Sequence, residues 1–227
     1  MVAQSTIENP HLLHPKVNAI VVNAGINLLG SIELAARIWN DDTIGAQRFD
    51  RLLVTGHHGK KRCDDTYSKE ALVSRFRMSR LEQVDSQGFT FHTGTQAAWV
   101  AEQMHSGGYT GAIVIAPSFH LARFYATIVE AMRRKYGDEE VFNIPLWPMA
   151  VKEDMNAPIL LDVGLEKVHG ESDDPTAYCN LTPLAASFGE HARINTYSVP
   201  KADGSAGDVA TPVFLGHCLQ MWQSSPR

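Results

Sequence analysis

The chain is predicted to be an α/β protein, a Rossmann-like three-layer sandwich with a mostly parallel sheet and helices on both faces. Short, near-continuously apolar runs alternate along the chain with segments whose apolar residues recur at helical spacing. The connections between these segments are short, as in repeated strand–helix units of a parallel sheet. Strands that are apolar on both sides indicate that helices cover both faces.

The first two strand–helix units lie near the N-terminus. Residues 19–22 are an apolar run with β-branched residues at its centre, and residues 51–55 form the second predicted strand. A turn signal and then a helix follow each strand. We expect Ser31 and Ser68 to begin the two helices, because a hydroxyl there can accept a hydrogen bond from a free N–H group of the first turn.

Two further units follow along the chain. A Phe-Thr-Phe alternation predicts a short strand within residues 86–93, and apolar residues at helical spacing predict a helix over residues 96–104. The apolar run at residues 112–116 predicts a buried strand. An amphipathic helix is expected directly after it, over residues 119–135.

The pattern weakens in the last third of the chain. Residues 143–147 are predicted to form an edge strand, because Pro145 cannot donate a hydrogen bond to a neighbouring strand. A helix is expected over residues 184–191, and residues 213–222 are expected to pack back on the core. We therefore interpret the chain as a single domain in which residues 151–227 are an irregular extension that packs on the rest.

Composition excludes several classes of protein. The 227 residues are 44% hydrophobic and carry a formal net charge of −5, so neither nucleic acid nor an anionic membrane is expected as the main partner. No apolar run reaches the roughly 18 to 20 residues of a membrane span, and the polar N-terminus does not resemble a secretory signal. We expect a soluble, cytoplasmic protein without a membrane span, whose three cysteines are free thiols. The sequence does not fix the oligomeric state.

The most informative residues come directly after the predicted strand at 112–116. His120 and Arg123 lie three residues apart at the start of a helix, and therefore on one face of it. Ligands of open parallel sheets bind at the carboxyl ends of the strands, and the start of a helix favours anions. An arginine suits a carboxylate or phosphate, and a histidine can move a proton near neutral pH. The sequence predicts a polar or anionic small-molecule ligand here, anchored by Arg123 beside a proton-transferring His120.

Other polar residues are predicted at the same edge of the sheet. The candidate ligand-binding residues are Asn23, Gly25, Asn27, Gly56, His57, Thr93, Thr95 and Ser118. Glu70, in the first turn of a predicted helix, is expected to orient the ligand or to pair with Arg123. Simpler interpretations stay open, since Glu70 can complement a helix dipole and either Thr93 or Thr95 can cap the helix that follows.

Taken in order, these motifs resemble the YdcF/SanA/ElyC family over about residues 17–150. The matching segments are Asn23-Ala-Gly25, Val54-Thr-Gly56, Ser68-Lys-Glu70, Thr93-Gly-Thr95 and Phe119-His-Leu-Ala-Arg123. The resemblance implies a Rossmann-like sheet. It also implies a nucleoside-type ligand such as S-adenosylmethionine, which one soluble member binds, while membrane-anchored members influence the bacterial cell envelope. The chain departs from the family at Gln96-Ala97, where Glu-Asn is usual, and at His57-His58, where a glycine-rich turn is frequent.

Three functions stay open at this point. The first is a small-molecule enzyme, either a transferase or a hydrolase, in which His120 moves a proton. The second is a non-catalytic ligand-binding or regulatory module linked to envelope metabolism. The third is a metal-dependent hydrolase that uses His57 or His58, although no spacing typical of zinc ligands is present and no metal is expected. A serine hydrolase centred on Ser118 would lack the G-x-S-x-G turn.

Overall fold

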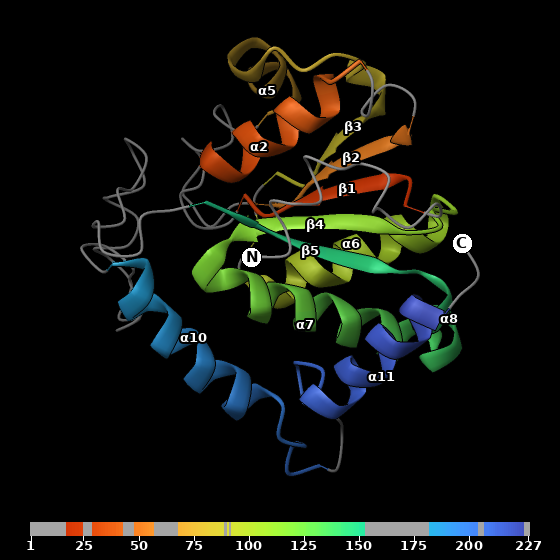
Figure 1. The fold of residues 1–227 in the computed structure, drawn as a ribbon, viewed down its shortest axis with the longest axis vertical. Coiled ribbons are helices and arrows are strands. Elements are labelled where there is room, and N and C mark those ends of the chain that lie inside the picture. Colours follow the sequence, from red (N-terminus) through yellow and green to blue (C-terminus); the bar gives the residue numbers. More distant parts are fainter. Residues whose placement is uncertain are drawn as a thin grey trace.

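The sheet confirms the predicted α/β class. The structure is a computed structural model that describes residues 17–24, 29–42, 48–56, 68–88, 90, 92–152, 182–203 and 207–224. In that part of the chain, the strands are β1 Ala19–Val22, β2 Arg51–Val54, β3 Val84–Ser86, β4 Ala112–Pro117 and β5 Leu146–Val151. All neighbours are parallel, in the order β3-β2-β1-β4-β5 (Figure 1). The strand order reverses between β1 and β4, which makes this the place where such sheets bind ligands.

β1 and β4, two of the interior strands, are those that the sequence predicts most clearly. Every residue of β1 and of β4 is buried. Val22, the last residue of β1, pairs with Val54 of β2 on one side and with Ile115 of β4 on the other. Because both faces of these strands are covered, their sequences carry no polar alternation.

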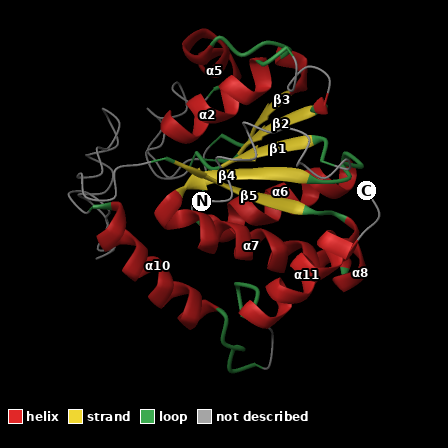
Figure 2. Ribbon diagram, in the orientation of Figure 1, coloured by secondary structure: helices red, strands yellow, loops and turns green. Residues whose placement is uncertain are grey.

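Helices cover both faces of the sheet (Figure 2). On one face lie α2 Leu29–Asn40 and α5 Lys69–Phe76, which pack over alternate strand residues such as Ile20 and Val22. On the other face α6 Thr93–Ser106 and α7 Ser118–Tyr136 pack over the residues in between, such as Ala19 and Val21. The alternation of strand side chains therefore divides the core into two layers of apolar side chains.

The C-terminal part of the chain adds helices on the α7 side. They are α8 Asp138–Asn143, α10 Pro183–Tyr197 and α11 Pro212–Ser224. Trp222 of α11 is buried in the core and donates from Nε1 to the carbonyl oxygen of Val141 at 3.0 Å. The segment 213–222 thus packs back on the core, as expected, and α10 extends the predicted helix 184–191 at both ends.

Two predicted strands are displaced in the structure. In place of the strand expected within residues 86–93, the structure has β3, which shares only Ser86 with it; Gly88, with φ +72°, follows the end of β3, and Phe89 and Phe91 lie outside the described residues. The edge strand expected at 143–147 is β5, which lies later because Asn143 still belongs to α8. β5 does lie at the edge of the sheet, and an edge strand tolerates Pro148 within it.

The helix starts agree with prediction in one case and differ in another. Ser68 caps α5 and accepts a hydrogen bond from the Ala71 N–H at 3.2 Å. Ser31 does not cap α2, because the helix already includes Leu29 and the Ser31 hydroxyl is buried without a hydrogen-bond partner. None of the helices in the described ranges is long and apolar enough to cross a membrane.

Candidate functional site

The candidate site lies where β1 and β4 end side by side. Asn23 directly follows β1, is fully buried, and donates from its backbone N–H to the Ile115 carbonyl oxygen at 2.9 Å. α7 begins at Ser118, immediately after β4, and carries His120 in its first turn. The structure therefore places Asn23 and His120 at the two sides of the point where strand order reverses.

His120 forms a buried pair with a carboxylate from the distant helix α10. Its Nδ1 lies 3.0 Å from Oε2 of Glu190, and the side chains of His120 and Glu190 are 1% and 2% exposed. Arg123 Nη2 also lies 3.3 Å from Nδ1, but the carboxylate is closer and its oxygens only accept hydrogen bonds, so we assign the proton of the neutral imidazole to Nδ1. Nε2 then carries the lone pair, and no residue in the described ranges hydrogen-bonds to it.

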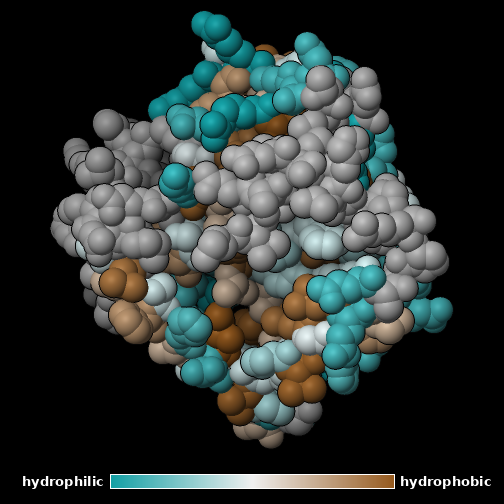
Figure 3. All heavy atoms as spheres, viewed as in Figure 1, coloured by the Kyte–Doolittle hydropathy of each residue, from teal (hydrophilic) through white to brown (hydrophobic). Residues whose placement is uncertain are grey.

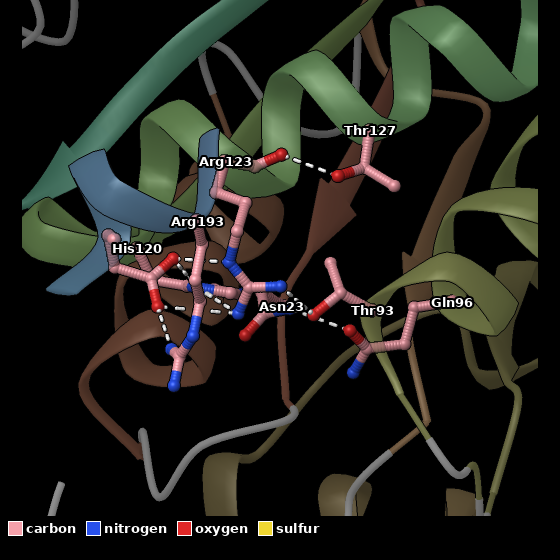
Figure 4. A network of polar contacts seen from close by, with 8 residues as sticks. Asn23, Thr93, Gln96, His120, Arg123, Thr127 and Arg193 are labelled. Atoms are coloured by element: carbon pink, nitrogen blue, oxygen red, sulfur yellow. Dashed lines mark hydrogen bonds and ion pairs between the residues drawn. The ribbon is translucent and has the colours of Figure 1, made fainter. Parts of the chain in front are cut away.

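Two guanidinium groups hold the same carboxylate (Figure 4). Arg123 contacts Glu190 with two nitrogens, Nε on Oε2 and Nη2 on Oε1, the latter at 3.3 Å. Arg193, one turn along α10, donates to Oε1 at 2.6 Å. Arg123 also donates from Nη1 to the Thr93 hydroxyl at 3.0 Å, which ties the cluster to the start of α6.

Burial and hydrogen bonding set the charges of the pair. Burial opposes the ionised form of Glu190, but the hydrogen bonds from His120 and Arg123 outweigh it and lower the pKa of Glu190 to about 2. Burial also lowers the pKa of His120 below its ordinary 6.5, against the opposing effect of Glu190. At neutral pH the carboxylate is therefore ionised and the imidazole neutral, which agrees with the assigned proton position.

The partner of Arg123 differs from the one expected. The two-pronged contact of its guanidinium is made with Glu190, within the protein, and not with Glu70. Glu70 is exposed in the first turn of α5, which covers the face of the sheet opposite to α7. The expected Glu70–Arg123 pair is therefore wrong, because α5 and α7 lie on opposite faces of the sheet, and the other expected role of Glu70, orienting a ligand, stays a prediction.

A chain of amide hydrogen bonds joins the loops that follow β1, β2 and β3. Asn23 donates to Gln96 Oε1 at 3.3 Å, and Gln96 in turn donates to the carbonyl oxygen of Gly56. Gln87 accepts from the Gly56 N–H at 2.8 Å and donates to the carbonyl oxygen of Thr95 at 3.1 Å. The predicted site residues Asn23, Gly56 and Thr95 thus lie at one edge of the sheet, where their polar groups form hydrogen bonds that connect the loops.

The two predicted threonines lie in the first turn of α6, and neither is its cap. The helix begins at Thr93, and the capping residue is His92, whose ring accepts from the Thr95 N–H at 3.3 Å. Thr95 completes a capping box with the backbone of His92. The predicted start at residue 96 is too late, because a histidine ring takes the place of the expected hydroxyl cap.

Some candidate residues lie outside the described part of the chain. These are Gly25, Asn27 and His57, together with His58. Within the described ranges, no group of three or more His, Cys, Asp or Glu side chains is arranged to hold a metal ion.

A groove runs along α6 and α7 and reaches the cluster at Thr93 and Arg123. It has a volume of about 710 Å³. Its lining residues are His92, Thr93, Gly94, Thr95, Ala98, Arg123, Thr127, Glu130, Ala131, Arg134, Lys135, Tyr197, Lys201, Asp208 and Val209. His120 is not among them, so the groove meets the cluster from the Arg123 side and does not open onto the imidazole.

Glu190 belongs to the candidate site and was not predicted from the sequence. It lies 70 positions after His120, so no local motif connects the two. One signal was present: Ala186 and Glu190 lie four residues apart on α10, and these are its buried positions among those the structure describes. A carboxylate on the buried stripe of a helix needs a cationic partner, which points to Arg123 or Arg193.

The chain itself provides the whole basis for interpreting this site. Comparison with protein-family models, with curated proteins and with solved structures gives no match for this chain. Its function is therefore argued from the chemistry of the His120 cluster and its place in the sheet.

Proposed function

We propose that the chain is a small-molecule enzyme in which His120 transfers a proton through Nε2. The observation that carries the proposal is the buried His120–Glu190 pair at the carboxyl end of β4. A carboxylate on Nδ1 fixes the orientation and tautomer of an imidazole and stabilises the imidazolium that forms when Nε2 accepts a proton.

The charge states of the pair support this role. A lowered pKa leaves His120 neutral near pH 7, so that Nε2 is able to accept a proton from a bound molecule. Glu190, with a pKa of about 2, stays ionised throughout such a reaction. The pair therefore has the charges that a general base and its orienting group require.

The proposed ligand is a small polar or anionic metabolite bound between the ends of β1 and β4. Open parallel sheets bind small molecules at this point, which supports a metabolite over a macromolecule. We further propose, from the sequence resemblance, that the chain is related to the YdcF/SanA/ElyC family and binds a nucleoside-type ligand such as S-adenosylmethionine. The metal-dependent hydrolase stays a prediction, because His57 and His58 lie outside the described residues.

A non-catalytic module is the second candidate, and one observation favours it. Arg123, Arg193 and Glu190 satisfy one another, so the cluster also serves as a clasp between α7 and α10. If linking α7 to α10 is the only role of the cluster, the protein catalyses no reaction. Substitution of His120 would then change only the stability of the protein and its affinity for a ligand.

The test begins with a ligand panel on the purified full chain. Adenosyl compounds, nucleotides, sugar phosphates and carboxylated metabolites are screened by thermal shift, and each ligand that raises the melting temperature is incubated and analysed by mass spectrometry. A ligand at 100 times its Kd should add about 2.7 kcal/mol to the free energy of unfolding. We expect at least one ligand of the panel to bind and to be converted.

Two variants then separate catalysis from binding. His120→Gln keeps a polar side chain of similar size, and we expect it to abolish conversion while the thermal shift persists. His105→Gln is the matched control, because His105 forms a similar pair with Glu140 at 2.9 Å on the surface. Conversion that survives in His120→Gln would contradict the proposed function, and binding without conversion in the wild type would favour the non-catalytic module.

A further inference from the structure

We propose that α10 is a lid that opens to admit the ligand and closes by placing Glu190 on His120. The inference rests on the proposed function and adds the way in which access to the site is controlled. The His120 side chain is 1% exposed, so a molecule from solvent does not reach the imidazole in this closed arrangement. Glu190, carried by α10, is one of the groups that cover it.

Few of the described side chains of α10 are buried, although the helix packs along α7. Among its described side chains only Ala186 and Glu190 are buried, whereas Leu184, Phe188 and Tyr197 are 45%, 70% and 42% exposed. A helix that docks permanently usually buries a continuous apolar stripe. In Figure 3 apolar side chains are visible at the surface where α10 lies. The contacts of Glu190 with His120 and Arg123 are therefore one attachment of this helix to α7, and polar contacts of this kind can be exchanged for water.

The C-terminal end of α10 is fixed, and this locates the hinge. Tyr197 accepts a backbone hydrogen bond from Val209 at 3.2 Å, and Arg134 of α7 contacts both the Gly207 carbonyl oxygen and Asp208. A Cβ atom on Gly207 would lie 2.3 Å from the Tyr197 carbonyl oxygen, so the chain is tightly packed there. Opening is therefore expected as a swing of the helix about residues 197–199, which breaks the contacts of Glu190.

Closure and activation of the base are the same event in this arrangement. When α10 is open, His120 loses the carboxylate that fixes its tautomer. When α10 closes over a bound ligand, Glu190 returns to Nδ1 and water is excluded from the site. The lid thereby restricts proton transfer to the state in which a ligand is enclosed.

Hydrogen–deuterium exchange on the full chain, without ligand, tests the lid. We expect the amides in the middle of α10 to exchange at least about ten-fold faster than those in the middle of α7. Glu190→Gln should speed exchange in α10 by a further factor of about ten or more, and should speed it more in α10 than in α7, where only the loss of overall stability acts. His105→Gln, the surface control, should change neither helix. Diethyl pyrocarbonate should modify His120 faster in Glu190→Gln than in the wild type.

A second variant covers the case in which Glu190→Gln does not fold. Gly189→Ala adds a methyl group into open space within α10, and it should slow exchange in that helix alone. The lid is contradicted if α10 exchanges as slowly as α7, or if the variants change both helices equally. Because these measurements need no ligand, they are independent of the proposed function, which fails separately if His120→Gln still converts its ligand.

Discussion

At the scale of single residues, the polar contacts of the candidate site centre on the carboxylate of Glu190. One buried carboxylate contacts an imidazole and two guanidinium groups from two helices. Such a group stabilises the fold only while its partners are present, because removing one member leaves uncompensated buried charge. Its removal therefore measures how strongly the cluster holds together.

Glu190→Gln is expected to lower the free energy of unfolding by about 3 to 5 kcal/mol, because it leaves Arg123 without its buried counter-ion. Urea denaturation at pH 7 measures the loss. The matched control is Glu140→Gln on the exposed His105–Glu140 pair, which should cost less than about 1 kcal/mol. Equal losses in the two variants would contradict a tightly coupled cluster.

Stability should fall in two stages as the pH is lowered. The pKa of His120 is lowered from 6.5, so below that value the unfolded chain takes up a proton that the folded protein resists. The pKa of Glu190 is lowered from 4.5 to about 2, so its contribution is complete above 4.5 and is lost as the pH falls toward 2.

Urea denaturation between pH 8 and pH 2.5 tests both stages. In the second stage, as the pH falls from 4.5 toward 2, the free energy of unfolding should decrease by an amount on the order of 3 kcal/mol. In Glu190→Gln this carboxylate contribution should be absent. A wild-type protein whose stability is constant between pH 7 and pH 3.5 would contradict the assigned charges.

At the scale of elements, the loops at the carboxyl edge are fixed by close backbone approach. Gly56 donates from its N–H to the side chain of Gln87, in the loop after β3, and its carbonyl oxygen accepts from the side chain of Gln96 in α6. A Cβ atom at this position would lie 2.6 Å from the Gly88 carbonyl oxygen and 2.8 Å from Thr90 Cβ. A glycine is therefore required here by packing, whatever its role toward a ligand.

Gly56→Ala is expected to destabilise the protein by about 1 to 3 kcal/mol, because the new methyl group meets backbone that cannot move aside cheaply. Thermal and urea unfolding measure the change. Gly216→Ala in α11 is the control, since nothing lies within 4 Å of its Cβ position, and it should be neutral or slightly stabilising. A neutral Gly56→Ala would mean that the loops after β2 and β3 are not packed as described.

The sequence predicts some elements better than others, for reasons visible in the structure. β1 and β4 are buried on both faces, so their apolar runs are unambiguous. β3 has three residues at an edge of the sheet, and only Val84 is buried, which leaves almost no pattern to detect. Short edge strands are stabilised by their neighbours, and their position is therefore hardest to predict from local sequence.

At the scale of the whole molecule, the C-terminal helices belong to the same core as the sheet. Trp222 lies in the apolar layer under α7, with an edge contact to Tyr125 and a hydrogen bond to Val141. This arrangement supports a single cooperative unit, in which the sheet and α11 unfold together.

Trp222→Ala is expected to cost about 3 to 5 kcal/mol, because it removes a large buried side chain together with its hydrogen bond to the Val141 carbonyl oxygen. Far-ultraviolet circular dichroism and intrinsic fluorescence should report one shared transition at a lower urea concentration. Separate transitions, or a loss confined to the C-terminal helices, would contradict a single cooperative domain.

Asn23 and His120 of the candidate site were predictable from the sequence, whereas Glu190 was not. The strand ends and the start of α7 place Asn23 and His120 together, and each is recognisable from the residues around it. Glu190 comes from a helix far along the chain, and its contact with His120 depends on how α10 docks on α7. Local sequence patterns do not specify such docking, so the missing half of the pair appears only in the folded structure.

The protonation of His120 is the central claim, and nitrogen chemical shifts measure it directly. In protein labelled with ¹⁵N-histidine, we expect that at pH 7 Nδ1 of His120 is protonated and Nε2 is not, and that Glu190→Gln weakens this preference. An imidazolium at pH 7, or a proton on Nε2 alone, would contradict the account, because His120 would then have no lone pair at Nε2 with which to accept a proton.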